Sequence, residues 1–395
     1  MPKIFSKFRY LDYHVFIPYI ALSIIGILMV YSSSSYIGMT KYHNAEHFFM
    51  RQALFVLIGL VIFLGTYAVA MRLFKNKRII MTVVFVLIVT LFGLLIFGEE
   101  KNGSKGWIDI GLPFNIQPAE FAKFIIIWYF SFIFSKKQQL IANDFKNTIV
   151  KPSILVGFIT SLILFQPDVG TSFIILFIAA VMVFSSGVSP KFGLLFSLGS
   201  GTLLGGFIWV VRYHREWVFF MKDYQYNRFL AFWDPFKLAQ STGMQLVNSY
   251  YALSRGGLFG VGLGESVQKT GYLPEPYTDF IMSIIGEELG LIGILLILCL
   301  FIFLVMRIYL IGIRAKDPFH SLFCIGTATM MLIQGSINLG GVLGLMPITG
   351  VTFPFISYGG SSTLLLAASM GIVCNISAAE KRRREKKLIS QPVSV

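Results

Sequence analysis

The chain has 395 residues, of which 55% are hydrophobic and only 13% are charged, and its formal net charge is +14. Soluble proteins carry about 25% charged residues, so this composition excludes a soluble enzyme, a disordered chain, a collagen and a disulfide scaffold. The expected fold is an all-α polytopic membrane protein, in which basic residues orient the helices and do not bind nucleic acid.

Ten apolar runs, each about as long as a membrane span, predict ten transmembrane helices. In chain order they cover residues 13–33, 52–71, 79–98, 118–135, 152–166, 171–186, 192–211, 280–306, 319–340 and 359–378. Lysines and arginines gather in alternate short loops, which places both termini in the cytoplasm. We therefore expect one integral membrane domain over residues 1–395, with a large extracytoplasmic loop at 212–279 and a basic cytoplasmic tail at 379–395.

The loop between the third and fourth predicted helices carries Lys105, Gly106 and Trp107 on the non-cytoplasmic side. By residue type alone, Trp107 fits the aromatic belt at a membrane surface. The alternative is that its indole stacks on a sugar ring or flanks a lipid headgroup.

The long loop holds several cations, among them Arg228 and Lys269, on the side that should be poor in positive charge. Arginine matches the geometry of phosphate oxygens, so an anionic headgroup such as a diphosphate would explain these cations. Scattered, solvated charge is the alternative interpretation.

Asp279 ends the long loop, shortly after Lys269 and Glu275, and lies at the start of the eighth predicted helix. It can simply cap that helix. It can equally act as a general base at the membrane surface, with Lys269 and Glu275 in reach to tune its pKa.

Glu287 and Glu288 follow two turns deeper in the same helix, and Lys123 is the cation at similar depth. Ionisable groups inside a membrane are costly and pair with one another. We expect a structural ion pair between Lys123 and one of these glutamates, with a proton path as the alternative.

The last non-cytoplasmic loop reads GVTFPFISYGGSS over residues 350–362 and contains Ser357, Tyr358 and Ser361. Irregular backbone at membrane depth is tolerated only where protein buries it or where it lines a wet cavity. This loop therefore predicts a cavity wall or a re-entrant turn near Asp279.

Seven motifs in this order resemble those of the SEDS family of shape, elongation, division and sporulation proteins, over about residues 13–378. They are GSKGWIDIG, QPAEFAK, QPDVGTS, RFLAFWDPF, TGMQLVNSYYALSRGGLFGVGLG, GYLPEPYTDFIMSIIGEELG and GLMPITGVTFPFISYGGSS. Two stretches, DFIMSIIGEELG and STGMQLVNSYYAL, are more similar to the division branch of Gram-positive bacteria than to the elongation branch.

The resemblance implies a ten-helix polymerase that extends peptidoglycan glycan strands from lipid II at the outer face of the bacterial cytoplasmic membrane. A class B penicillin-binding transpeptidase and other division membrane proteins would be its partners at the septum. Asp279 matches the family's essential aspartate and Trp107 its important tryptophan, and Lys269, Glu275 and the turn at 357–362 also match. Many relatives carry an arginine where this chain has Gly106. If that arginine binds phosphate, Lys105 or another residue must take this role here.

The expected reaction is an inverting displacement in which Asp279 deprotonates the acceptor hydroxyl and undecaprenyl diphosphate leaves. No metal ligands are predicted, and a divalent cation such as Mg²⁺ or Mn²⁺ is left open as a counter-ion for the diphosphate. The rival hypotheses are a lipid II flippase with Lys123, Glu287 and Glu288 on its path, an elongation-type polymerase, and a structural scaffold.

Overall fold

The computed structural model describes residues 7–98, 106–108, 115–138, 144, 146–218, 221 and 223–390. This part of the chain is helical, apart from turns, irregular connections and one isolated antiparallel bridge between Ile108 and Ile116. Lys105, which the sequence offers as a phosphate ligand, lies outside the described residues.

Each of the ten predicted helices is present. They are α2 (Tyr13–Tyr42), α3 (His47–Ala68), α5 (Lys77–Phe97), α6 (Pro118–Lys137), α7 (Lys151–Phe165), α8 (Val169–Ser185), α9 (Pro190–Tyr213), α12 (Ile281–Arg314), α13 (Pro318–Val342) and α14 (Gly360–Ser390). Within the described residues nine helical segments are long and apolar enough to cross a membrane, and α8 is shorter. The all-α polytopic fold is confirmed.

Several helices extend well beyond their apolar runs. The most marked case is α14, which continues to Ser390 and so includes part of the predicted basic tail at 379–395. Backbone hydrogen bonds hold a helix together whether or not its side chains are apolar, so hydropathy marks only the membrane-buried part.

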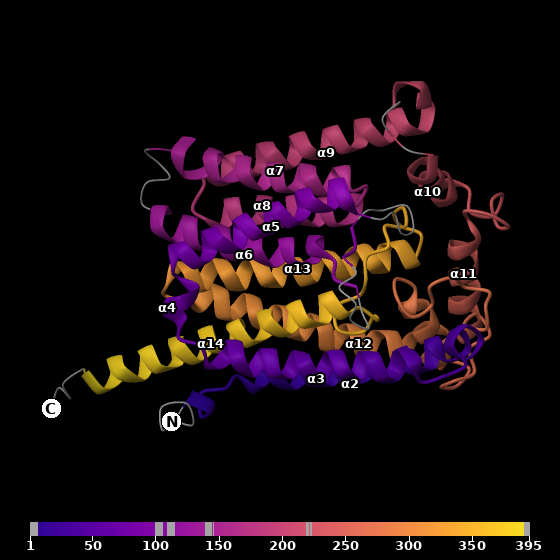
Figure 1. Cartoon of the computed structure of the whole chain (residues 1–395), viewed down its shortest axis with the longest axis horizontal. Coiled ribbons are helices and arrows are strands. Elements are labelled where there is room, and N and C mark those ends of the chain that lie inside the picture. Colours follow the sequence, from indigo (N-terminus) through magenta and orange to yellow (C-terminus); the bar gives the residue numbers. More distant parts are fainter. Residues whose placement is uncertain are drawn as a thin grey trace.

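The long helices lie side by side and run between two ends of the bundle (Figure 1). Both termini and the short helix α4 (Met71–Phe74) lie at one end, hereafter the terminal end. The opposite end carries α10 (Asp223–Trp233) and α11 (Met244–Gly256), which belong to the long loop. The long loop is therefore partly helical.

The centre of the bundle is formed by α6, α13 and α14. Of the residues in their most apolar 18-residue stretches, 78%, 72% and 83% are buried, compared with 6% in α9. Large aromatic side chains fill this core, among them Phe130, Phe323 and Phe353. A helix that protein surrounds can carry polar residues that find partners there, and α6 and α13 do so.

Gly290 interrupts α12 two residues after Glu288, with φ 69° and ψ −171°. The long loop fills the break, because Gly262 N donates to Glu288 O at 3.0 Å and Leu291 N donates to Gly257 O at 2.9 Å. A Cβ atom on Gly260 would lie 2.2 Å from Glu288 O, so this close approach requires glycine. The loop is thus hydrogen-bonded into the helix that follows Asp279.

Candidate functional site

Asp279 lies two residues before α12 and ends the long loop, whose helices α10 and α11 lie opposite the terminal end of the bundle (Figure 1). The N-cap of α12 is Phe280, and no side chain caps it, so the capping alternative for Asp279 is wrong. The Asp279 carboxylate accepts a hydrogen bond from Thr278 Oγ1 at 3.0 Å, and no other described side chain donates to it.

Burial raises the pKa of Asp279 from its ordinary value to about 6. The charge of Glu275 adds to this effect, while the Thr278 hydroxyl and the more distant charge of Arg228 oppose it. A carboxyl group with a pKa near the working pH can accept a proton and still be ionised in a large share of molecules, which suits a general base.

A small pocket adjoins Asp279, and α13 and the irregular segment after it form its walls. Asn338 Nδ2 donates to Asp279 O at 2.7 Å and to Val351 O at 2.8 Å, and this amide joins the two walls. Ile348 and Gly350 also line the pocket. The prediction that this segment forms a cavity wall near Asp279 is confirmed.

Arg228 on α10 reaches the same wall, because its Nη1 donates to Ile348 O at 3.1 Å. The structure therefore brings together Asp279 and the long-loop arginine that the sequence singles out as a phosphate ligand.

The turn after the pocket wall holds Ser357, Tyr358 and Ser361. Ser357 Oγ accepts from Phe353 N at 2.8 Å, and Ser361 Oγ accepts from Gln117 N at 3.1 Å. Both serines are buried. Their hydroxyls thus shape the turn, which gives them a structural task beside the predicted binding role.

Tyr358 ties this turn to the segment before Asp279. Its backbone N–H donates to Tyr277 O at 2.9 Å, and its ring packs against Phe48 and Tyr277. Glu275 is exposed, and its carboxylate accepts from Thr278 Oγ1 at 3.1 Å. The Thr278 hydroxyl has a single proton, so Glu275 competes with Asp279 for it and also acts on Asp279 through charge.

Trp107 is 38% exposed and lies directly before the Ile108–Ile116 bridge. An exposed indole at this position is available for stacking.

Lys269 is 5% exposed and lies on Glu288, away from Asp279, which corrects the expectation that it tunes that carboxylate directly. Lys269 Nζ donates to Glu288 Oε1 at 2.7 Å and to Ser32 Oγ at 3.1 Å. This contact joins the long loop, α12 and α2, so Lys269 has a structural position.

Glu287 makes a second tie of the same kind. It accepts from Arg255 Nη1 at 2.7 Å, from Val267 N at 3.0 Å and from the Ser266 hydroxyl. The two glutamates of α12 thus hold the long loop in place, Glu287 through residues 255, 266 and 267 and Glu288 through Lys269.

Lys123 is not paired with Glu287 or Glu288, and that prediction is wrong. Its ammonium donates to Glu120 Oε1 at 2.7 Å on its own helix and to Gln334 Oε1 at 2.9 Å on α13. The expected pair was based only on similar depth in the membrane. In the bundle α6 packs against α13, whereas the two glutamates belong to α12. Glu120 lies three residues before Lys123, a helical spacing that could have identified it.

Sequence reasoning also missed Gln117 and Asp168. Gln117 Nε2 donates to Asp168 Oδ2 at 3.0 Å, and Asp168 Oδ1 caps α8 through Thr171 N at 2.9 Å. Gln117 precedes a proline and Asp168 follows one, in the two Gln-Pro motifs of the sequence. The repetition of this motif was the sequence feature that could have identified them. Burial raises the pKa of Asp168.

The described residues contain no group of three or more histidine, cysteine, aspartate or glutamate side chains that could hold a metal ion. Asp279 is the only carboxylate among the described residues that line the pocket, and Glu275 acts on it through charge, which is too few ligands for a closed metal site within this part of the chain.

Residues 13–382 match the family described as cell cycle protein, FtsW/RodA/SpoVE. A Bacillus subtilis protein named "Probable peptidoglycan glycosyltransferase FtsW" is 40% identical, over 95% of this chain and 93% of the relative. Relatives with the same name in Lactococcus lactis and Enterococcus hirae are 39% and 37% identical, each over 97% of this chain and 96% of the relative.

Two solved structures share the fold. A chain from a peptidoglycan synthase complex, studied for how polymerisation and crosslinking are coordinated, is similar with a TM-score of 0.73 and 24% identity, over 94% of this chain and 98% of its own. The rod shape determining protein RodA of Thermus thermophilus is similar with a TM-score of 0.66 and 24% identity, over 94% of this chain and 97% of its own.

Proposed function

The chain belongs to the FtsW/RodA/SpoVE family of cell cycle proteins, and from that premise we propose that it is a peptidoglycan glycosyltransferase that polymerises lipid II during cell division. Three relatives that cover nearly the whole chain carry the FtsW name, which confirms the predicted resemblance to the division branch.

The observation that carries the proposal is the Asp279 carboxyl group, with its pKa raised to about 6 by burial, in the lining of a small pocket. Asp279 ends the long loop, whose helices α10 and α11 lie at the bundle end opposite the basic termini (Figure 1). Positive charge favours the cytoplasm, which supports the proposal that Asp279 acts at the outer face of the membrane.

In the proposed mechanism Asp279 accepts the proton of the acceptor sugar's 4-hydroxyl as its oxygen attacks the anomeric carbon of the donor. The new glycosidic C–O bond forms as the C–O bond to undecaprenyl diphosphate breaks, with inversion of configuration. One general base is enough for a single displacement.

The leaving diphosphate gains negative charge beside a low-dielectric membrane and needs cations near it. Arg228 is positioned at the pocket wall for this role. Lys105 is the second proposed phosphate ligand, and Trp107 the residue that stacks on a sugar ring. Mg²⁺ or Mn²⁺ would be held mainly by the diphosphate oxygens and water.

The proposed partners are a class B penicillin-binding transpeptidase and other membrane proteins of the division machinery, at the septal cytoplasmic membrane. The likeness to a chain from a peptidoglycan synthase complex supports a transpeptidase partner.

The test is glycan synthesis from purified lipid II by the full-length protein in detergent micelles, with and without its cognate transpeptidase. We expect polymer with the wild-type protein and none with Asp279→Asn. Micelles have no second leaflet, so glycan synthesis there excludes a protein that only flips lipid II. Equal polymer from wild type and Asp279→Asn would overturn the assignment of the base.

A further inference from the structure

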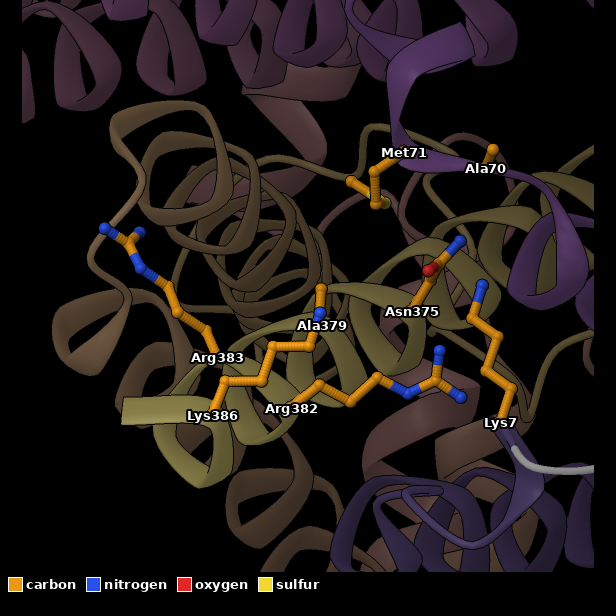
Figure 2. A pocket seen from close by; sticks show the side chains of 8 residues that line it. All are labelled: Lys7, Ala70, Met71, Asn375, Ala379, Arg382, Arg383 and Lys386. Carbon is orange, nitrogen blue, oxygen red and sulfur yellow. The ribbon is translucent and has the colours of Figure 1, made fainter. Parts of the chain in front are cut away.

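A pocket of about 710 Å³ lies at the terminal end of the bundle, and Figure 2 shows the side chains that line it. Asp279 is not among them. Three segments distant in sequence form it: the N-terminal segment at Lys7, the turn between α3 and α4, and the last part of α14. The proposed transferase reaction does not use this pocket.

Four cationic side chains line the pocket, and none of its lining residues is acidic. These cations are Lys7, Arg382, Arg383 and Lys386. Figure 2 shows Arg382 extending toward Lys7 on one side of the pocket and Arg383 on the other side. Like charges gathered in one cleft repel one another unless an anion lies between them.

The two cations that face each other lie over aromatic rings, Arg382 over Tyr10 and Lys7 over Tyr67, but have few hydrogen-bond partners. Arg382 Nη2 is buried and has no hydrogen-bond partner in the described part of the chain. Lys7 Nζ donates to the backbone oxygens of Ala68 and Val69 at 3.5 and 3.3 Å. Burial and the charge of Arg382 lower the pKa of Lys7 to about 8.

The nearby carboxylates are held by other groups. Glu385 accepts from the Tyr10 hydroxyl at 2.6 Å, and Asp12 accepts from Arg307 Nη2 at 2.8 Å and from Ser377 Oγ at 2.6 Å. The anion that would neutralise the pocket therefore has to come from outside the described chain.

The rest of the lining is apolar, because Ala70, Met71 and Ala379 complete its walls. α3 ends at Ala68, so the pocket lies where this helix leaves the membrane. Basic pockets between transmembrane helices at this level suit phosphate headgroups, whose acyl chains can leave along an apolar wall.

We propose that this pocket binds the phosphodiester headgroup of an anionic membrane lipid in the leaflet at the terminal end. The guanidinium groups of Arg382 and Arg383 and the ammonium groups of Lys7 and Lys386 bind the phosphate oxygens. The bound lipid joins the N-terminal segment, the α3–α4 turn and α14 across the pocket.

An acidic peptide fits the pocket less well, because its backbone would need uncharged polar partners. Among the lining residues only Asn375 offers one, and its Nδ2 already donates to Thr66 O and Val69 O at 3.0 and 2.7 Å. A lipid headgroup needs no such partners beyond the cations.

The test measures the thermal unfolding midpoint of the full-length protein in detergent during titration with dioleoylphosphatidylglycerol, dioleoylphosphatidylcholine or inorganic phosphate. We expect saturable stabilisation by the anionic lipid alone. Arg382→Gln combined with Arg383→Gln should weaken the apparent lipid affinity by about tenfold to thirtyfold, since each basic contact contributes to the attraction.

The matched control is Lys316→Gln combined with Arg384→Gln, which removes two exposed charges from the same end but outside the pocket. Its lipid affinity should stay within about twofold of wild type. Ala379→Met keeps every charge and fills the pocket, so it should weaken lipid binding even if the double arginine variant fails to fold.

Three results would overturn the proposal. They are equal stabilisation by both lipids, equal loss of affinity in the control and the pocket variants, and an Ala379→Met protein that binds the anionic lipid as wild type does. Stabilisation by inorganic phosphate to the same extent would assign the pocket to free phosphate and overturn the lipid assignment.

Discussion

Asp279 and Asp12 have the same side chain and lie at opposite ends of the bundle, and each precedes the first residue of a long helix by one or two positions. Asp12 is fully buried and accepts hydrogen bonds from Arg307 and Ser377, with Lys381 Nζ at 3.6 Å. Asp279 receives one hydroxyl hydrogen bond, from Thr278.

The two environments move the two pKa values in opposite directions. Burial alone would raise the pKa of Asp12, but the bonds from Arg307 and Ser377 and the charge of Lys381 bring it below its ordinary value. Burial without a cation in contact raises the pKa of Asp279 to about 6. Paired carboxylates hold the terminal end together, while the unpaired one is able to exchange a proton.

The difference between the two aspartates is tested most strongly by replacing each in turn with asparagine and measuring lipid II polymerisation. Asp279→Asn should lower the rate by a factor of about 10² to 10⁴, because a general base contributes that much. Asp12→Asn should leave the rate per folded molecule near that of wild type. A similar loss in both variants would mean that the substitutions act through the fold.

Lys269→Met removes the cation that neutralises the buried Glu288 carboxylate. We expect the free energy of unfolding to fall by about 3–5 kcal/mol, because breaking one partner leaves an uncompensated buried charge. The measurement is denaturant unfolding in detergent, with the exposed Lys41→Met as the matched control. Adding Glu288→Met should recover most of the loss; failure to recover would show that Lys269 acts in another way.

The same aspartate substitutions should change stability with opposite signs. At pH 8 the ionised Asp279 is destabilising, so Asp279→Asn should raise the free energy of unfolding by up to about 3 kcal/mol. Asp12→Asn should lower it by about 2 kcal/mol, because it weakens charge-assisted hydrogen bonds. Shifts of the same sign in thermal unfolding would contradict the assigned environments.

Gly260→Ala tests the close contact between the long loop and α12. It places a Cβ atom 2.2 Å from Glu288 O at a residue with φ 81°, and we expect a loss of about 2 kcal/mol or more. Gly157→Ala, where the new Cβ meets no atom within 4 Å, is the control and should be neutral or slightly stabilising. Equal unfolding midpoints for the two variants would contradict the need for glycine at this contact.

The sequence predicts the helices well because a span of apolar residues is a local property. It predicts α2 only as far as residue 33, whereas the helix continues to Tyr42, since its last turns carry polar residues that hydropathy does not register. Asp279 was identifiable because it ends a long outer loop at the start of a helix.

Partners across the bundle were not predictable in the same way. Lys123 was assigned to the wrong helix because depth in the membrane does not reveal which helices are neighbours. The break at Gly290 was equally hidden, because its cause is a loop segment that begins at residue 257 and fits against it. Such contacts depend on the packed bundle and leave no local pattern.

The most direct test of the central claim is the pH dependence of lipid II polymerisation by the wild-type protein between pH 5 and 8. Asp279 must be ionised to accept a proton, so kcat/KM should fall as pH drops through about 6, by about tenfold per unit below it. Unfolding does not explain this loss: protonation of Asp279 favours the folded state, and Asp12, with its lowered pKa, loses its contribution only below about pH 4. A rate that stays constant from pH 5 to 8, with the protein folded throughout, would contradict the assignment of Asp279 as the base.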